Sequence, residues 1–171
     1  PRIGPFDLQQ LALPPRLVSL ELENLGVVVL PPLPDATLKR LVWHEKSDPG
    51  VVRRTGPLPS SLVYLKCNLD SGLALPDLPP LLEVLNVSTS SLPVGVLPAL
   101  PATLRHLSVS WCNPTQLPDN LPLQLTHLAC SNSKLTALPA LPNTLKFLDC
   151  SYNPQARLPD LPDKLLHLAC R

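Results

Sequence analysis

The sequence lacks several features that many folded domains contain. It has no Met, only six Gly, and two each of Trp, Tyr and Phe in 171 residues. Its 14 Lys and Arg nearly balance its 13 Asp and Glu, and the basic residues are scattered instead of clustered. A nucleic-acid-binding or anionic-membrane-binding surface needs such a cluster. No apolar run approaches the roughly 18 residues of a membrane-spanning helix. We therefore expect neither nucleic acid nor a membrane as a partner.

Sequence patterns that carry enzyme chemistry are also missing. The chain contains no G-x-S-x-G nucleophile motif, no H-E-x-x-H zinc motif and no Gly-rich phosphate-binding loop. Its five Cys and four His form no C-x-x-C pair and no cluster with zinc-ligand spacing. We therefore predict that this chain is not an enzyme and that it holds no cofactor and no metal ion.

The chain is rich in leucine and proline, with 24 Pro residues, and its leucines recur with a strict period. The stretch from Leu138 to Asn153, LPALPNTLKFLDCSYN, shows the repeated unit most clearly, and nearly every segment from Leu13 onward is a degenerate copy of it. Two leucines three positions apart recur every 20 to 24 residues as eight anchor pairs: Leu17/Leu20, Leu38/Leu41, Leu62/Leu65, Leu82/Leu85, Leu104/Leu107, Leu125/Leu128, Leu145/Leu148 and Leu165/Leu168. This regularity identifies a repeat protein.

Each copy of the unit predicts one short strand. A third apolar residue follows two positions after each second anchor: Leu22, Trp43, Cys67, Val87, Val109, Cys130, Cys150 and Cys170. This alternation puts the anchors on the buried side of a strand and the residues between them on the other side. Stacked copies would bring the strands together as a parallel sheet.

Leu-Pro pairs precede most anchors and predict an extended return segment. Leu141-Pro142 begins four residues before the anchor Leu145, and Leu138-Pro139 begins three residues earlier still. Because Pro lacks an amide hydrogen and disfavours a helical residue before it, L-P-x-L-P predicts polyproline-II-like chain. We predict a right-handed solenoid of about eight coils, with parallel β-strands on the concave face and extended polyproline-II-like segments on the convex face.

The pattern divides the chain into a cap or lead-in over residues 1–12 and a repeat domain over residues 13–171. The missing initiator Met and the lack of a signal-like N-terminus suggest that the sequence is part of a longer protein, cut within the repeats at the C-terminus. The last coil would leave Leu165 and Leu168 uncovered. We therefore expect either further residues after Arg171 or end-to-end self-association.

The N-terminal repeats are less regular than the C-terminal ones. The widest anchor spacing contains Lys46–Gly56, KSDPGVVRRTG, directly after the second predicted strand. This segment is either a tolerated surface insertion or a contact loop, with Arg53 and Arg54 as its contributing residues.

The five cysteines are explained by packing. Cys67, Cys130, Cys150 and Cys170 occupy the third apolar position, and Cys112 lies three positions after another. Small buried hydrophobic residues fit these positions. We expect free thiols, because the odd count fits a reducing compartment and inward side chains of parallel strands do not point at one another.

The outward positions of the predicted strands are the candidate site. The residues directly before the second anchors form one column, in which aromatic and imidazole side chains are concentrated. Long polar residues lie in this column and in the next one. The residues predicted to bind a protein are Arg40, Tyr64, Lys66, His106, His127, Phe147, Asp149 and His167. The alternative is an ordinary solvated sheet face. A histidine metal site is disfavoured, because no carboxylate shares the column of His106 and His127.

The segments LPALPNTLKFLDCSYN and LPDLPDKLLHLAC resemble the short bacterial type of leucine-rich repeat, L-P-x-L-P-x-x-L-x-x-L-x-V/C-x-x-N-x-L. The repeat is similar to those of type III secretion effectors such as YopM and the IpaH/SlrP group. The sequence departs from that pattern at the asparagine position, where only Asn153 is Asn. Its equivalents include Asp70, Ser90, Cys112 and Ser133. Cys112 is an accepted substitute, whereas the others should weaken the polar ladder between coils.

The resemblance implies a protein–protein interaction module of a virulence effector, secreted from a bacterium into the host-cell cytoplasm, that binds a host protein through its concave face. One alternative is the substrate-recognition domain of an effector ubiquitin ligase. The catalytic domain would then lie outside this chain, which lacks the C-x-D motif of those ligases: Ser151 follows Cys150, and Arg171 follows Cys170. A second alternative is a bacterial surface or adhesion repeat protein.

Overall fold

A computed structural model describes residues 12–23, 32–44, 56–68, 75–87, 97–112, 114–153 and 157–171. These residues contain eight strands and no helix: β1 (Ser19–Glu23), β2 (Arg40–His44), β3 (Tyr64–Asn68), β4 (Val84–Val87), β5 (His106–Ser108), β6 (His127–Ala129), β7 (Phe147–Asp149) and β8 (His167–Ala169). The part of the chain that the structure describes therefore has no helix that could cross a membrane.

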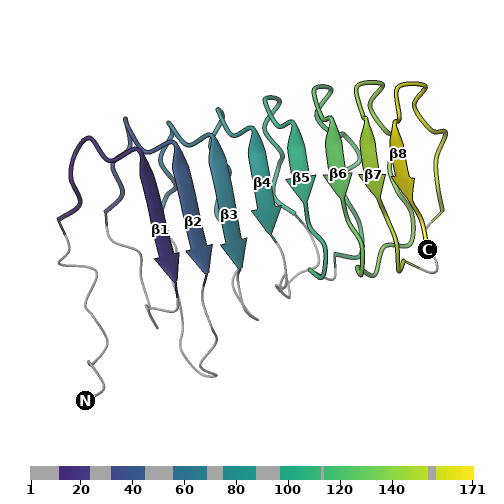
Figure 1. Ribbon diagram of the computed structural model, residues 1–171, viewed down its shortest axis with the longest axis horizontal. Helices are drawn as coiled ribbons and strands as arrows, with labels where there is room; N and C mark the ends of the chain where they lie inside the picture. The colour runs from purple at the N-terminus through teal and green to yellow at the C-terminus, as the bar shows by residue number, and fades with distance from the viewer. Residues whose placement is uncertain are drawn as a thin grey trace, which may run out of the picture.

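The strands form one parallel sheet in sequence order, from β1 to β8 (Figure 1). The second anchors are aligned across the whole sheet: Leu20 pairs with Leu41, Leu107 with Leu128, and so on to Leu148 with Leu168. A parallel pair needs a long connection between its strands, and the repeat supplies one return segment per coil. The solenoid predicted from the repeat is confirmed.

The anchors form one continuous core between the sheet and the return segments. The first and second anchors of the six central coils are at most 2% exposed, from Leu38 and Leu41 to Leu145 and Leu148. The third apolar residues Trp43, Val87 and Cys130 belong to the same cluster. Each coil thus buries its leucines against its two neighbours, which is how a solenoid is stabilised.

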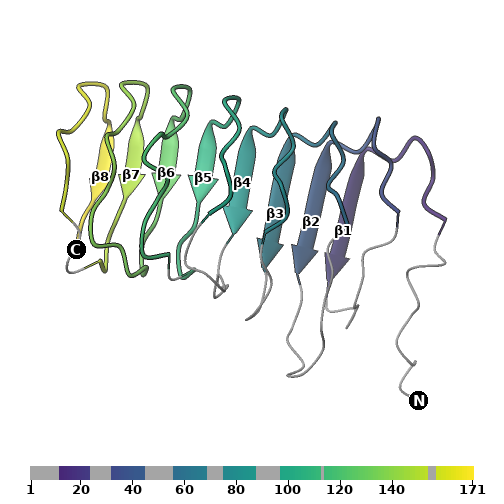
Figure 2. The same ribbon diagram turned by 180° about the vertical axis from the view of Figure 1, so that it is seen from behind.

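The return segments run on the opposite side of the core from the strands, and Figure 2 shows them crossing in front of the sheet. The described Leu-Pro segments are neither helix nor strand, as predicted. Seven of the eight segments end in a β-turn in which a Pro carbonyl accepts a hydrogen bond from the first anchor, as in Leu145 N–H to Pro142 O at 2.9 Å and Leu104 N–H to Pro101 O at 3.0 Å. In the second coil, Leu38 N–H donates to Pro34 O, four residues earlier. Proline lacks a donor but keeps this acceptor. It therefore both extends the segment and starts the turn into the next strand.

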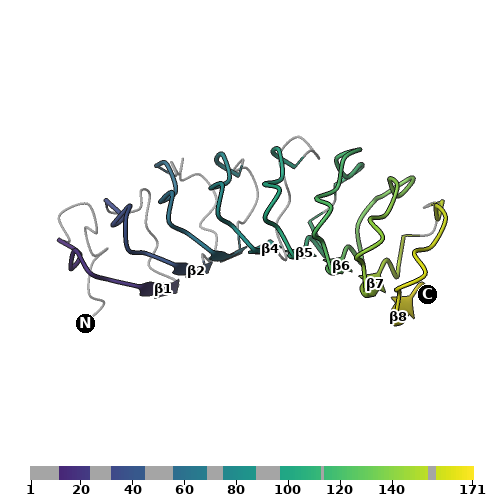
Figure 3. The same cartoon turned by 90° about the horizontal axis from the view of Figure 1, so that it is seen from above.

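The solenoid is curved, with the strands along the inner side of the arc (Figure 3). Neighbouring strands are held at about 4.8 Å by their backbone hydrogen bonds. Neighbouring return segments lack most of these hydrogen bonds because of their prolines, so they spread apart on the outer side. The sheet is therefore the concave face, as predicted from the sequence.

The expected cap over residues 1–12 lies almost entirely outside the described residues and stays a prediction. The same holds for Arg53 and Arg54, and for the ladder positions Asp70 and Ser90.

Candidate functional site

The concave face presents the outward residues of the eight strands in columns. The eight residues predicted to bind a protein all lie on these strands, and each is at least partly exposed: Arg40 on β2, Tyr64 and Lys66 on β3, His106 on β5, His127 on β6, Phe147 and Asp149 on β7, and His167 on β8. The register aligns His106, His127, Phe147 and His167 directly across neighbouring strands.

These four rings form a continuous stack. The ring centroids of His106 and His127 are 4.2 Å apart with an angle of 21° between the planes. His127 and Phe147 are 5.8 Å apart at 20°, and Phe147 and His167 are 4.8 Å apart at 3°. Parallel strands impose this spacing, because identical positions repeat at about 4.8 Å, close to the distance for ring stacking. We call these four residues the ring ridge.

His106 is the most restricted member of the ring ridge. Its Nδ1 is buried and is the one buried side-chain nitrogen or oxygen atom in the described residues without a hydrogen-bond partner. The pKa of His106 is lowered, first by burial, then by His127 and Arg105, while Glu83 opposes the shift. Both the geometry and the charges therefore favour a neutral imidazole at position 106.

His127 has a partner for its inner nitrogen. Thr126 Oγ1 lies 2.9 Å from His127 Nδ1 and 3.0 Å from the carbonyl oxygen of Arg105. The threonine has one hydroxyl hydrogen, which it donates to that carbonyl, so its oxygen accepts from His127 Nδ1–H. This assignment leaves His127 Nε2 as an acceptor on the concave face.

The stacked geometry is unsuited to metal chelation by His106 and His127. Their planes are nearly parallel, so lone pairs in the ring planes do not converge on one point. Among the described residues, no three His, Cys, Asp or Glu side chains are grouped so that they could hold a metal ion.

Small side chains form a flat bed beside the ring ridge. The next outward positions on β5 to β8 are Ser108, Ala129, Asp149 and Ala169. Asp149 Oδ1 accepts from the Ser151 backbone N–H at 3.1 Å, and no Lys or Arg among the described residues forms an ion pair with it. The bed therefore presents one carboxylate that is open to a partner's donor.

The N-terminal half of the concave face is charged. The guanidinium of Arg40 lies 5.1 Å from the centroid of the Tyr64 ring and 3.5 Å from a carboxylate oxygen of Glu21. Val42 lies in an outward position but is only 2% exposed. The register sets it between Glu21 and Lys66 on the two neighbouring strands.

Two sets of polar side chains join neighbouring coils, and the first was predicted from the sequence. Asn153 Nδ2 donates to the carbonyl oxygens of Cys130, Cys150 and Ser151 at 2.8 to 3.3 Å, and its Oδ1 accepts from Leu135 N–H at 3.3 Å. At the equivalent position, Ser133 donates to two carbonyl oxygens. Cys112 donates to the carbonyl oxygens of Val87 and Ser110. Both substitutes keep the ladder, and Ser133 does so with fewer hydrogen bonds than Asn153.

The second set was missed in the sequence. A hydroxyl residue directly before the first anchor donates to a carbonyl oxygen of the preceding coil, as in Thr144 to Leu123 O at 2.7 Å and to Leu125 O at 2.8 Å. Four residues form this hydroxyl ladder: Thr37, Ser61, Thr103 and Thr144. These residues all lie at one position of the repeat, which the sequence shows. That pattern was missed because only the apolar positions were compared.

All five cysteines are free, and four of them are buried. Burial raises the pKa of Cys67 to about 12, with a smaller contribution from Cys112. Burial also raises the pKa of Cys130 to about 12, aided by Cys150 and Asp149. Cys170 differs from the packing prediction because it is exposed: it belongs to the coil of β8, against which no further described coil packs.

The turns after β5, β6 and β7 contain left-handed residues at one repeated position. The φ angles are 67° for Trp111, 52° for Asn132 and 57° for Tyr152. Asn adopts this conformation readily, whereas a bulky aromatic residue does so rarely and at a cost of about 1–3 kcal/mol. Trp111 is nevertheless 57% exposed and Tyr152 is 59% exposed.

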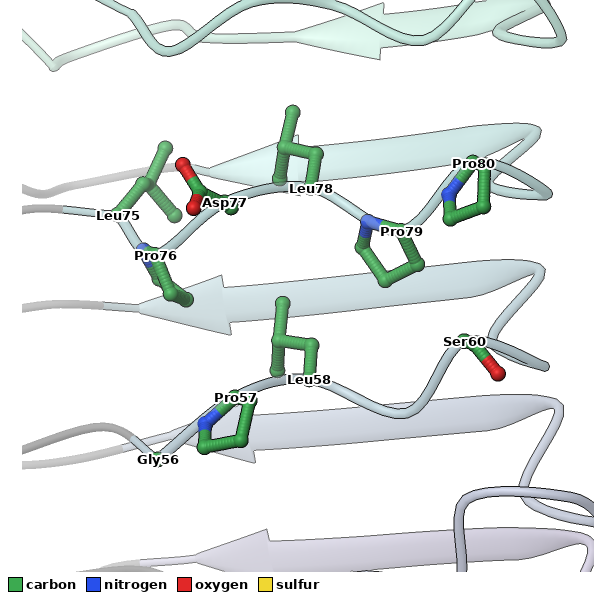
Figure 4. Close-up of a pocket in the computed structure, with 10 residues that line it drawn as sticks. All are labelled: Gly56, Pro57, Leu58, Ser60, Leu75, Pro76, Asp77, Leu78, Pro79 and Pro80. Atoms are coloured by element: carbon green, nitrogen blue, oxygen red, sulfur yellow. The ribbon is translucent and has the colours of Figure 1, made fainter.

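The convex side contains a hollow between the return segments that precede β3 and β4 (Figure 4). Its wall is formed mostly by leucines and prolines, with Asp77 as its one charged residue: Gly56, Pro57, Leu58, Ser60, Leu75, Pro76, Asp77, Leu78, Pro79 and Pro80. The prolines prevent these two segments from pairing as strands. By contrast, Ala137 and Arg157 form a parallel bridge where the convex side has no Pro.

Solved structures of three bacterial effectors resemble this fold. YopM from Yersinia enterocolitica WA-314 matches with a TM-score of 0.60 at 28% identity, over 94% of this chain and 43% of the YopM chain. YopM from Yersinia pestis gives 0.61 at 28%, over 89% and 48% of the two chains. A Shigella effector leucine-rich repeat domain gives 0.57 at 27%, over 85% and 62%. The chain thus spans less than two thirds of each of these solved chains.

No protein-family model and no curated protein matches the sequence. The comparison therefore rests on the solved structures. These structures agree with the resemblance of the Leu-Pro repeats to bacterial effector repeats. The chain is a leucine-rich repeat domain similar to those of the Yersinia and Shigella effectors.

Proposed function

We propose that this domain binds a host protein through the ring ridge and the bed beside it, as a module of an effector secreted from a bacterium into the host-cell cytoplasm. The observation that supports this most directly is the continuous stack from His106 to His167 on an open sheet face. Stacked rings lose little side-chain entropy on binding, and aromatic side chains are enriched at interface hot spots.

Shape and charge support the same assignment. The ring ridge stands beside the small side chains of the bed. A partner segment that lies along the bed would therefore contact the rings with one of its sides. Asp149 offers its carboxylate oxygens, and His127 offers its second ring nitrogen, Nε2. A binding module needs a few such oriented polar groups on an apolar surface.

The test is capture of a partner from host-cell lysate by the purified domain, with the partner identified by mass spectrometry. The combined variant Tyr64→Ala, His106→Ala and Phe147→Ala should lose the partner that the wild type captures. The matched control, Lys134→Ala with Lys146→Ala, changes two exposed residues away from the outward columns and should keep it. Loss with both variants, or with neither, would exclude the ring ridge as the binding site.

A second candidate is the substrate-recognition domain of an effector ubiquitin ligase. It rests on the resemblance of the repeats to those of the IpaH/SlrP group; the Shigella effector repeat domain, of which this chain covers 62%, has a similar fold. The catalytic domain would lie outside these 171 residues, so the full-length sequence decides: a following domain with a C-x-D motif supports the ligase. Ubiquitin transfer to the captured partner by that full-length protein would complete the case.

We further propose that copies of this 171-residue chain associate through the coil of β8. Leu158, Leu161, Leu166 and Leu168 are 39% to 81% exposed there, whereas Leu138 and Leu148 of the coil before are at most 6% exposed. Sedimentation velocity over a range of concentrations should show dimers for the wild type. Leu158→Ser with Leu168→Ser should sediment as a monomer, and a wild type that stays monomeric throughout would exclude the association.

A further inference from the structure

Trp111 and Tyr152 lie on a different surface from the ring ridge. They follow β5 and β7 at the edge of the solenoid where the strands end, which is the lower edge in Figure 1. Asn132 occupies the same position after β6, between them. Each of the three has a left-handed backbone, and each backbone N–H bonds to the next coil: Trp111 to Ser131 O, Asn132 to Ser151 O and Tyr152 to Arg171 O.

Trp111 and Tyr152 are unfavourable for the stability of the fold in two respects. A Trp or Tyr with positive φ is strained relative to Asn or Gly. Both rings are also more than half exposed, so burial in the domain does not offset that strain. Local rules of this kind are broken mostly at functional sites, where contact with a ligand provides the compensation.

The spacing of the two rings indicates the kind of ligand. They are two coils apart, which corresponds to about 9.6 Å along the edge from the spacing of parallel strands. A polyproline-II helix repeats every three residues over about 9.3 Å, so prolines three positions apart in a P-x-x-P segment match this distance. Aromatic side chains that stack on such prolines are a recurrent way to recognise proline-rich segments.

Asn132 supplies a polar group at the midpoint. Its side-chain amide forms no hydrogen bond to another residue in the part of the chain that the structure describes. The carbonyl groups of a polyproline-II segment are free of internal hydrogen bonds and need a donor. An amide between two aromatic rings can donate to the carbonyl between two bound prolines.

We propose that Trp111, Asn132 and Tyr152 bind a proline-rich P-x-x-P segment of a partner protein, which runs along the edge of the solenoid across the strand ends. The site is separate from the ring ridge and does not depend on the function proposed for it. A second copy of this chain is a less suitable ligand. Its own P-x-x-P segments carry buried prolines, such as Pro142 and Pro162.

The test uses decaproline, which forms a polyproline-II helix in water, with a Gly-Ser decamer as the control peptide. The chain has two Trp, and Trp43 is only 5% exposed, so a change of fluorescence on peptide addition reports Trp111. Decaproline at millimolar concentration should shift the emission of Trp111 to shorter wavelength in a saturable manner. The absence of a shift, or an equal shift with the Gly-Ser decamer, would overturn the proposal.

Two variants separate binding from folding. Trp111→Asn and Tyr152→Asn should each weaken decaproline binding about tenfold by calorimetry, as expected for loss of one stacked ring. Both should unfold at a temperature equal to or above that of the wild type, because Asn tolerates positive φ. Unchanged affinity in both variants would refute the site. If Trp111→Asn instead abolishes concentration-dependent sedimentation and leaves decaproline binding intact, Trp111 joins two copies of the chain and the proposal fails.

Discussion

The imidazole rings of His106 and His127 stack on neighbouring strands with their centroids 4.2 Å apart. Two rings at this distance tolerate one positive charge better than two, since like charges this close repel each other. The pKa of His106 is accordingly lowered, with burial as the first cause. His106 is therefore the acid-sensitive residue at the start of the ring ridge.

Acid should destabilise the fold through His106. Its pKa in the folded state lies below the value of 6.5 expected when unfolded, so the unfolded state binds the proton first and stability falls as pH drops below about 6.5. The effect is small because the imidazole is partly exposed. The melting temperature between pH 5 and 8 should depend on pH less steeply in His106→Phe than in the wild type. A steeper dependence in the variant would contradict this assignment.

Alkali should destabilise the fold through Cys67. Burial raises its pKa from 9.0 to about 12, so the unfolded chain loses the thiol proton more easily and stability falls as pH rises above about 9. Denaturant unfolding at pH 7 and at pH 10 measures the difference. Cys67→Ala should be less stable than the wild type at pH 7 because of the cavity, yet should lose less stability between the two pH values.

Thiol reactivity should distinguish the five cysteines. Only Cys170 is exposed, and the thiols of Cys67, Cys130 and Cys150 have raised pKa values, which lowers their fraction of reactive thiolate. A chromogenic disulfide reagent at pH 7 should therefore modify one thiol quickly and the others only on unfolding. The fast phase should vanish in Cys170→Ser. Two or more fast thiols would mean that the inner cysteines are more accessible than their burial indicates.

Asn153 should contribute more stability than the other ladder residues. Asn153→Ala leaves three carbonyl oxygens and the Leu135 N–H without this partner, so the free energy of unfolding should fall by about 2–3 kcal/mol. Asn153→Ser should lose less, because Ser133 shows that a serine at this position still donates to two carbonyl oxygens. Urea titration of the two variants measures both values, and equal losses would rule out the serine bond at position 153.

Leu81→Thr should stabilise the domain. Leu81 is 50% exposed and lies directly before the anchor Leu82, at the position where Thr103 and Thr144 donate to the preceding coil. A threonine there gains a hydrogen bond of about 1 kcal/mol and gives up little burial. Leu81→Val is the control of matched shape without the hydroxyl. If the two variants have the same stability in urea, the hydroxyl ladder does not extend through this coil.

The repeat made the fold predictable, because apolar periodicity reports burial directly. Leu38, Leu62 and Leu82 could be placed in the core, since each repeats the environment of Leu145. The columns of the candidate site could be placed for the same reason. What periodicity could not supply was the contact between side chains. The alignment of His106 with His127 was expected, but their stacking depends on rotamers that only coordinates define.

Residues that depart from the repeat were harder to interpret. Trp111 and Tyr152 were not singled out from the sequence, because backbone φ angles leave little trace in a sequence when Asn, Trp and Tyr all occur at one position. The burial of Val42 was missed as well. Its outward position on β2 predicted exposure, whereas only 2% of the residue is exposed.

The hydroxyl ladder and the Asn153 amide group donate in one direction along the chain. The Thr37 and Thr144 hydroxyls and the Asn153 amide all donate to carbonyl oxygens of the coil that precedes their own. On the ribosome, the preceding coil emerges first and already presents those acceptors when the next coil arrives. The domain is therefore built to grow by addition during synthesis, with each finished coil acting as the template for the one that follows.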